Sequence, residues 1–172
     1  SDLRPPSRYG ELLFGDLFRE QLVLFGGVRS AASVSETWLW NGNTWTESAP
    51  ANRPPVRADA GATFDWTRGL GLLYGGFNAG QFLGDLWAWN GTDWSLLSSG
   101  GPPPRTSPGL SYDVNRDVTV MFGGSSGPLF QPGGLRNDTW EWNGASWAAR
   151  TPANSPSARE GAGRASAPGP GR

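Results

Sequence analysis

The side chains that could carry chemistry in this chain are carboxylates, arginines and tryptophans. The sequence contains no histidine and no cysteine. This excludes Ser-His-Asp triads, Cys-His pairs and the usual zinc sites. Two paired carboxylates could still hydrolyse a glycosidic bond. However, most of the acidic residues fall at turns or strand ends, so we expect no enzyme, no metal site and no cofactor.

One group of residues recurs three times along the chain, and such a repeat decides the architecture. An apolar run ends in a Gly-Gly pair that begins at Gly26, Gly75 and Gly123, with spacings of 49 and 48 residues. A Trp-x-Trp-Asn-Gly run follows each pair, and another tryptophan lies five residues after the second tryptophan of each run. Three further positions recur before each pair: an arginine (Arg8, Arg57, Arg105), an aspartate (Asp16, Asp65, Asp113) and a second arginine (Arg19, Arg68, Arg116).

Each repeat is predicted to form four β-strands, and no segment has a helical apolar period of useful length. The strands are expected near residues 11–15, 21–25, 36–40 and 43–47; 61–65, 70–74, 85–89 and 93–97; and 109–113, 118–122, 138–142 and 145–149. The Asp-x-x-Arg segments are expected to build the turn between the first two strands, because aspartate accepts hydrogen bonds from turn amides.

The Asn-Gly pairs predict the connection between the last two strands of each repeat. Asn and Gly best tolerate the positive φ angles that a two-residue type I′ turn requires at both positions. Such a turn would place the first tryptophan opposite the third: Trp38 and Trp45, Trp87 and Trp94, Trp140 and Trp147. The second tryptophan lies two residues along the strand, so all three should share one face.

Composition and charge limit the possible partners. The net charge of −1 gives the chain as a whole no electrostatic reason to bind nucleic acid. No apolar run reaches the length of about 18 residues that a membrane helix needs. The 26 glycines and 15 prolines are periodic and flank β-rich runs, which indicates an all-β protein with many turns.

These repeats resemble the kelch repeat, in the bacterial form related to the central propeller of galactose oxidase. The resemblance covers residues 5 to about 152. It implies an all-β, kelch-type β-propeller with three four-stranded antiparallel blades, at about 8–49, 57–98 and 105–151. Residues 153–172 are low in complexity and have too little apolar surface to order themselves, so we expect a disordered tail there. The tryptophan faces would form the core between blades. The copper chemistry of the relative does not carry over, because its ligands include histidine and cysteine.

The chain departs from the family in its number of repeats. Propellers typically have about 4 to 8 blades, and three blades would leave two outer faces bare. Soluble proteins seldom expose large apolar patches. We therefore expect either a partial propeller that belongs to a longer one, or self-association of two chains into a six-bladed ring.

The resemblance also places the longer loops on one rim, together with the proline-rich links between blades. Long, variable loops are typical binding regions. We expect a non-catalytic module that binds a protein or peptide there. The candidate contact residues are Phe77, Asn78, Gln81, Phe82, Leu129, Phe130, Gln131 and Arg136, with Arg57 and Arg105 nearby.

Two alternatives remain open. The module could bind carbohydrate at a bacterial cell surface, with tryptophan faces stacking on sugars. It could also be the propeller domain of a larger enzyme whose active groups lie outside this chain.

Overall fold

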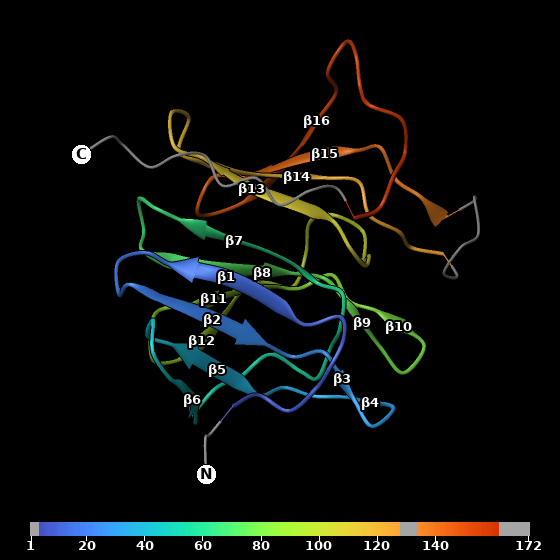
Figure 1. The fold of residues 1–172 in the computed structure, drawn as a ribbon. Coiled ribbons are helices and arrows are strands. Elements are labelled where there is room, and N and C mark those ends of the chain that lie inside the picture. The colour runs from blue at the N-terminus through green and yellow to red at the C-terminus, as the bar shows by residue number, and fades with distance from the viewer. Residues whose placement is uncertain (1–3, 128–133, 162–172) are drawn as a thin grey trace.

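A computed structural model describes residues 4–127 and 134–161, and its regular secondary structure is almost entirely antiparallel β-sheet (Figure 1). Three four-stranded sheets follow one another along the chain. Their strands are β1 (Leu12–Asp16), β2 (Gln21–Phe25), β5 (Thr37–Trp40) and β6 (Trp45–Ser48); β7 (Gly61–Asp65), β8 (Leu70–Tyr74), β11 (Leu86–Trp89) and β12 (Trp94–Ser98); β13 (Gly109–Asp113), β14 (Val118–Phe122), β15 (Thr139–Trp142) and β16 (Trp147–Arg150).

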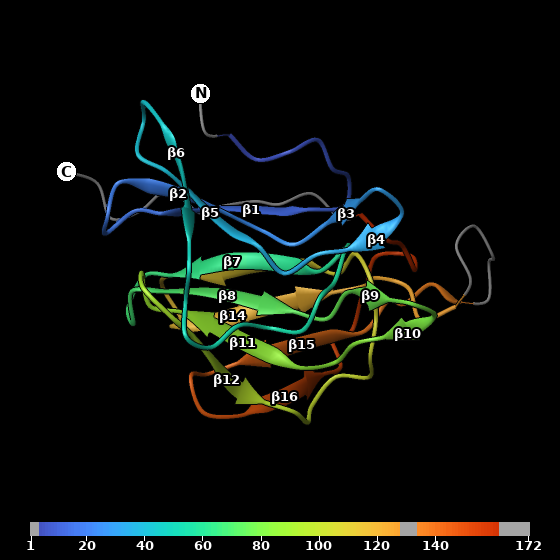
Figure 2. The ribbon, with the colours of Figure 1, turned by 90° about the horizontal axis from the view of Figure 1, so that it is seen from below.

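Two short hairpins complete the described strands. They are β3 (Val28–Arg29) with β4 (Ala32–Ser33), and β9 (Phe77–Asn78) with β10 (Gln81–Phe82). Both hairpins project from the same side of the stacked sheets (Figures 1 and 2). The all-β class and the three four-stranded antiparallel sheets are therefore confirmed, with strand ends within two residues of the predicted ones.

The predicted register of the tryptophan hairpins is wrong. The second tryptophan of each strand, not the first, lies opposite the third: Trp40 pairs with Trp45, Trp89 with Trp94 and Trp142 with Trp147. Only the glycine of each Asn-Gly pair has a positive φ, so the turn is not type I′.

The asparagine side chain explains this register. Asn41 Oδ1 accepts hydrogen bonds from the backbone N–H groups of Asn43 and Thr44, at 2.9 and 2.8 Å. The same bonds form at Asn90 and Asn143. An asparagine that caps the turn in this way stabilises a four-residue loop. All three tryptophans nevertheless remain on one face, since directly opposed residues point to the same side of a sheet.

The Asp-x-x-Arg segments form turns, as predicted, and an ion pair closes each turn. The pairs are Asp16–Arg19, Asp65–Arg68 and Asp113–Arg116, with N–O distances of 2.9, 2.9 and 2.7 Å. Arg68 also pairs with Asp117 at 2.8 Å, which links the turn of the second sheet to that of the third.

A continuous apolar layer lies between the first and second sheets. Leu12, Phe14, Val23 and Phe25 of the first sheet meet Phe64, Leu73, Trp89 and Trp94 of the second. Trp94 packs against Phe25 with ring centroids 5.1 Å apart. Its Nε1–H donates a hydrogen bond to Thr37 Oγ1 at 3.0 Å, across the two sheets. The tryptophan face of the second sheet is thus turned toward the first.

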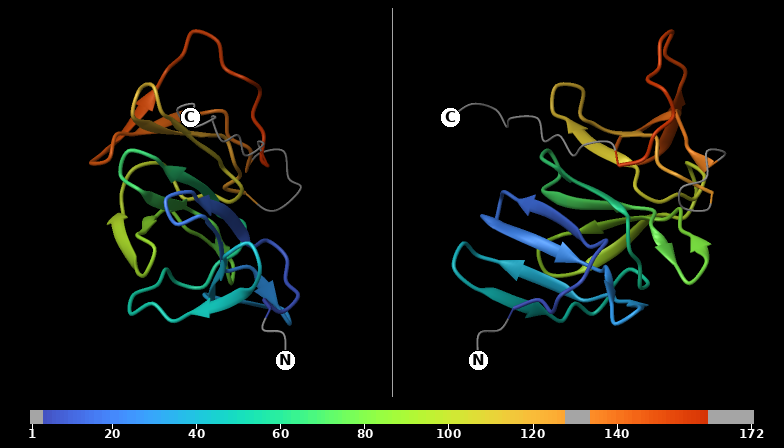
Figure 3. Two further views of the ribbon diagram at one scale, coloured as in Figure 1. Left: turned by 60° about the vertical axis from the view of Figure 1, so that its left-hand side comes forward. Right: turned by 45° about the vertical axis from the view of Figure 1, so that its right-hand side comes forward.

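The same arrangement repeats between the second and third sheets. Leu72, Tyr74 and Leu86 meet Leu110, Met121 and Trp142. Trp147 lies edge-on to Tyr74, with ring centroids 5.4 Å apart. Each fully buried side chain of this size contributes about 1.5 to 3 kcal/mol, so two such layers hold the three sheets in one stack (Figure 3).

The chain after β16 returns to the third sheet. Figure 1 shows this segment looping outward and then back. The backbone N–H of Gly124 donates to Arg159 O at 2.8 Å, and Arg159 N–H donates to Arg136 O at 3.0 Å. The first part of the expected tail, up to residue 161, therefore runs beside the sheets, and residues 162–172 lie outside the described ones.

Gly71 in β8 provides a test of the contact between the first two sheets. A Cβ at this position would overlap the ring of Phe14. We expect Gly71→Ala to lower the free energy of unfolding by about 1 to 3 kcal/mol, the usual cost of overpacking a core. Urea unfolding followed by tryptophan fluorescence would measure it.

Two comparisons make this test specific. Gly100→Ala adds a Cβ where no atom lies within 4 Å, and it should change stability by less than about 0.5 kcal/mol. The double variant Gly71→Ala/Phe14→Leu replaces the ring with a smaller side chain, and it should recover part of the lost free energy of unfolding. A Gly71→Ala variant as stable as wild type would contradict this packing.

Candidate functional site

A buried arginine holds the segment that leads into each sheet. We call Arg8, Arg57 and Arg105 the link arginines. Arg57 Nε donates to Pro55 O at 3.0 Å, and Nη1 donates to Gly75 O at 2.9 Å. Its guanidinium also pairs with both carboxylate oxygens of Asp85, at 2.7 and 2.8 Å. Arg105 repeats these contacts with Pro103, Gly123 and Asp138, and Arg8 with Pro6, Gly26 and Glu36. Each arginine side chain therefore holds the sheet that follows it.

The backbone of the same arginines holds the preceding sheet. Gly27 N–H donates to Arg57 O at 2.9 Å, and Gly76 N–H donates to Arg105 O at 2.8 Å. Gly26 has φ = 69°, and a Cβ there would lie 2.6 Å from Arg57 O. This close approach explains the Gly-Gly pairs. One residue thus joins two consecutive sheets, by its backbone on one side and its side chain on the other.

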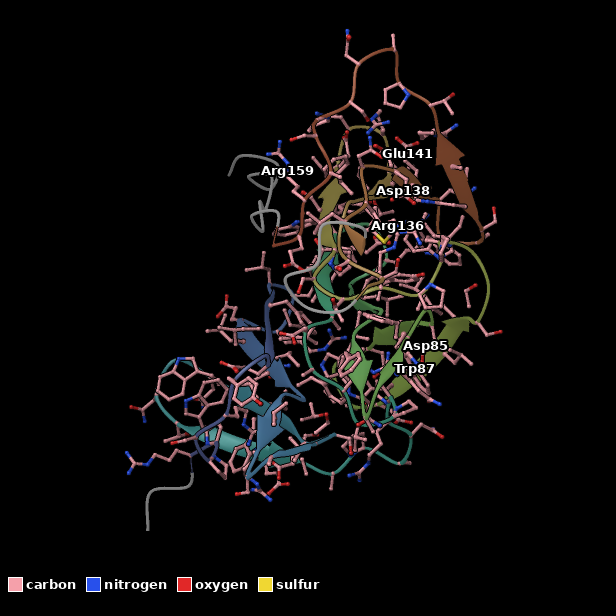
Figure 4. All side chains as sticks on the ribbon, turned by 90° about the vertical axis from the view of Figure 1, so that its right-hand side faces the viewer. Asp85, Trp87, Arg136, Asp138, Glu141 and Arg159 are labelled. Carbon is pink, nitrogen blue, oxygen red and sulfur yellow. The ribbon has the colours of Figure 1, made fainter. Side chains whose placement is uncertain are left out.

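These contacts shift the pKa of the acidic partners. Burial opposes ionisation of Asp85, but the hydrogen bonds and charge of Arg57 outweigh it and lower the pKa of Asp85 below its ordinary value of 3.8. The pKa of Asp138 is lowered in the same way by Arg105, and that of Glu36 by Arg8. Trp87 and Trp140 also donate from Nε1 to these carboxylates, at 2.6 and 2.8 Å. Figure 4 shows Asp85 with Trp87 on the second repeat and Asp138 on the third.

The links place the two hairpins on one rim. Just past each arginine, the chain forms an isolated antiparallel bridge with the residue that follows the Gly-Gly pair. The bridges are Tyr9–Val28, Ala58–Phe77 and Thr106–Ser125. In the first two repeats a short hairpin continues from this bridge. In the third, Ser125 bridges to Leu135 instead.

A cavity of about 340 Å³ lies on this rim, between the β9–β10 hairpin and the third repeat. Phe77 and Phe82 are directly opposed on the hairpin, and their rings pack edge to face with centroids 5.3 Å apart. Both rings are partly exposed. The lining residues described are Asp59, Phe77, Gly80, Phe82, Thr106, Ser126 and Gly127. We call this cavity the rim pocket.

Asp59 contributes the only acidic side chain among the described lining residues of the rim pocket. Its backbone is fixed on both sides, since Asp59 N–H donates to Gly10 O at 2.8 Å and Asp59 O accepts from Ser107 N–H at 2.7 Å. Burial raises the pKa of its carboxyl group above 3.8, and the nearby charges of Glu160 and Glu11 raise it further.

The predicted contact residues fall into several groups. Phe77 and Phe82 line the rim pocket, whereas Asn78 and Gln81 pair with each other beside it on the hairpin. Arg136 donates from Nε and Nη2 to Ser126 Oγ, at 2.9 and 2.7 Å, and so supports the wall. Leu129, Phe130 and Gln131 lie outside the described residues.

Arg57 and Arg105 occupy a different place. Their exposed fractions are 1% and 0%, and their guanidinium groups bind the carbonyl and carboxylate groups described above. They position the rim but have no exposed surface of their own on it.

Sequence reasoning did not identify Asp59, Thr106 or Ser126. One signal points to Asp59: the equivalent positions in the other repeats hold Gly10 and Ser107, and all three have a positive φ, at 53°, 66° and 48°. A small or turn-forming residue two positions after each link arginine predicts this bend. The pattern does not predict which residues of other segments lie near the bend.

A second cavity, of about 380 Å³, lies beside the tryptophans of the second sheet. The partly buried Trp87 lines it together with Trp94, and polar groups come from Asn52, Arg53 and Ser95. Leu96 completes the described lining.

The described ranges contain neither a metal-binding cluster of side chains nor a helix that could cross a membrane. Across residues 4–127 and 134–161, no group of three or more acidic residues is arranged to hold a metal ion. Within the same ranges, no helix has the length and hydropathy needed to cross a membrane. No model of a known protein family matches the sequence, and a search of curated proteins finds no match either.

The link arginines make a direct stability test. We expect Arg105→Ala to destabilise the fold by about 3 kcal/mol, because it leaves Asp138 and the Gly123 carbonyl without their buried partner. The shift of the urea unfolding midpoint would measure this.

Arg159→Ala is the matched control. Arg159 makes the same Nε bond to a carbonyl two residues earlier, at 3.0 Å, but its side chain is exposed. Its replacement should cost less than about 1 kcal/mol. Equal losses in the two variants would show that the buried guanidinium contacts do not stabilise the stack.

Proposed function

We propose that this protein is a kelch-type propeller module that binds a protein or peptide through the rim bearing the β9–β10 hairpin. The kelch-type assignment is supported by three successive four-stranded sheets that share the same arginine links, Gly-Gly approaches and tryptophan layers. In this proposal each sheet is one blade.

Two observations support a place for further blades. Leu13 and Leu22, on the tryptophan face of the first sheet, are 41% and 37% exposed. Arg159 repeats the backbone contacts of a link arginine, yet among the described residues its side chain donates only to Ser157. The equivalent arginines bind the next sheet. A longer propeller, or a second copy of the chain, would supply that sheet.

Binding at the rim is supported by one observation above all. The rim pocket presents two packed phenylalanine rings at the surface, on a hairpin that contributes little to either core layer. Partly exposed aromatic rings with nearby polar groups are typical of sites that anchor a partner's side chain.

Selection from a displayed random peptide library tests this proposal. Wild-type protein should enrich peptides that bind at least about tenfold more weakly to Phe77→Ala/Phe82→Ala, since anchor contacts of this kind contribute more than 1 kcal/mol. Leu97→Ala, which removes another exposed apolar side chain, should bind as wild type does. Enriched peptides that bind the Phe77→Ala/Phe82→Ala variant as tightly as wild type would contradict binding at the rim.

Carbohydrate binding is a second candidate, favoured by the cavity at Trp87. A partly buried indole beside asparagine, arginine and serine side chains is suited to stack on a sugar and hydrogen-bond its hydroxyl groups. A glycan array probed with wild type and Trp87→Phe would then show oligosaccharides retained only by wild type. No retained glycan, or equal retention by both proteins, would exclude this candidate.

A further inference from the structure

The carboxylate of Asp59 has no partner that would neutralise it within the described part of the chain. No described side chain or backbone N–H donates a hydrogen bond to it, and no described arginine forms an ion pair with it. Arg136, which lies behind the lining residue Ser126, directs its Nε and Nη2 to the hydroxyl group of Ser126. Asp59 therefore differs from Asp85 and Asp138, which are each paired with a buried arginine.

The surrounding charge is also negative. Glu11 and Glu160 both act on Asp59, and both raise its pKa. They come from the start of the first sheet and from the segment after the third, so three parts of the chain bring carboxylates toward one place. An acidic ligand would be repelled here. A neutral apolar ligand would bury Asp59 further without supplying a partner, which is costly.

Apolar and aromatic surface lines the same pocket as Asp59. Phe77 and Phe82 form one wall of the same pocket, and Gly80 at the hairpin tip adds no side chain that would cover them. Aromatic faces attract cations as well as alkyl chains. A long side chain with a charged end, such as lysine or arginine, buries its methylene stem on apolar surface while its head group pairs with an acid.

We propose that the rim pocket binds a lysine or arginine side chain of a partner protein, with its stem on Phe77 and Phe82 and its head group on Asp59. This inference rests on the proposed function and specifies which residue the partner inserts. The backbone of Asp59 is already fixed by Gly10 and Ser107, so the bend that carries the carboxylate is formed before the partner arrives.

The peptides enriched by wild-type protein provide the test. In the best binder, each lysine and arginine is replaced singly by norleucine, which keeps an alkyl chain but lacks the charge. Affinities are measured by calorimetry for wild type and for Asp59→Asn. Asparagine tolerates a positive φ as well as aspartate does, so this variant keeps the bend. If its unfolding midpoint falls, Asp59→Ser replaces it, because Ser107 occupies the equivalent bend at φ = 48°.

We expect one basic residue whose norleucine replacement weakens binding to wild type about tenfold, as a close charge pair does. The same replacement should change binding to Asp59→Asn less than about twofold, because the partner charge is already gone. Glu11→Gln removes a neighbouring negative charge without changing the described lining, and it should weaken binding less than about threefold.

Two other outcomes overturn the inference, and they are distinguishable. Peptides whose binding depends on Phe77 and Phe82, but on neither a basic residue nor Asp59, would support binding at the rim and contradict the insertion of a basic side chain. Enriched peptides whose binding does not depend on the phenylalanines would contradict both the rim as the binding site and the insertion of a basic side chain there.

Discussion

The link arginine is the contact on which the rest of this structure depends. The guanidinium group of one residue donates hydrogen bonds to a carbonyl and a carboxylate of one sheet. The backbone carbonyl of the same residue accepts a hydrogen bond from the Gly-Gly pair of the preceding sheet. The charge is buried, and it is tolerated because nearly every donor of the guanidinium has an acceptor. This geometry sets the spacing between sheets and places each hairpin at the same end.

The aromatic layers supply the apolar surface that these contacts align. Every tryptophan face of the second and third sheets is turned toward the preceding sheet, where smaller residues leave room for it. Gly71 shows how close this fit is, since even a methyl group would collide with Phe14. The arginines therefore join consecutive sheets, and the rings pack with aliphatic side chains in the apolar layers between them.

In the proposed function, binding uses parts of the chain that contribute little to the contacts between sheets. The β9–β10 hairpin and the acidic bend at Asp59 add little to the two core layers. The three repeats differ at these positions: Gly10, Asp59 and Ser107 at the bend, and Val28, Phe77 and Ser125 after the glycines. Three sheets with shared link contacts and unlike residues at one rim would allow one repeat to carry the proposed binding pocket without changing the contacts that join the sheets.

The sequence by itself determined the strands of the three four-stranded sheets and the common face of the tryptophans, because these follow from local alternation and from a repeat visible in the chain. The sequence did not predict the short β3–β4 and β9–β10 hairpins, which lie in segments expected to be loops. It did not determine the hairpin register, since the side chain of Asn41 competes with the two-residue turn that its backbone would favour. Phe77 and Phe82 were recognisable as exposed loop aromatics. Asp59 became part of the same pocket only through tertiary structure, because the residues that surround it come from three repeats brought together by contacts between sheets.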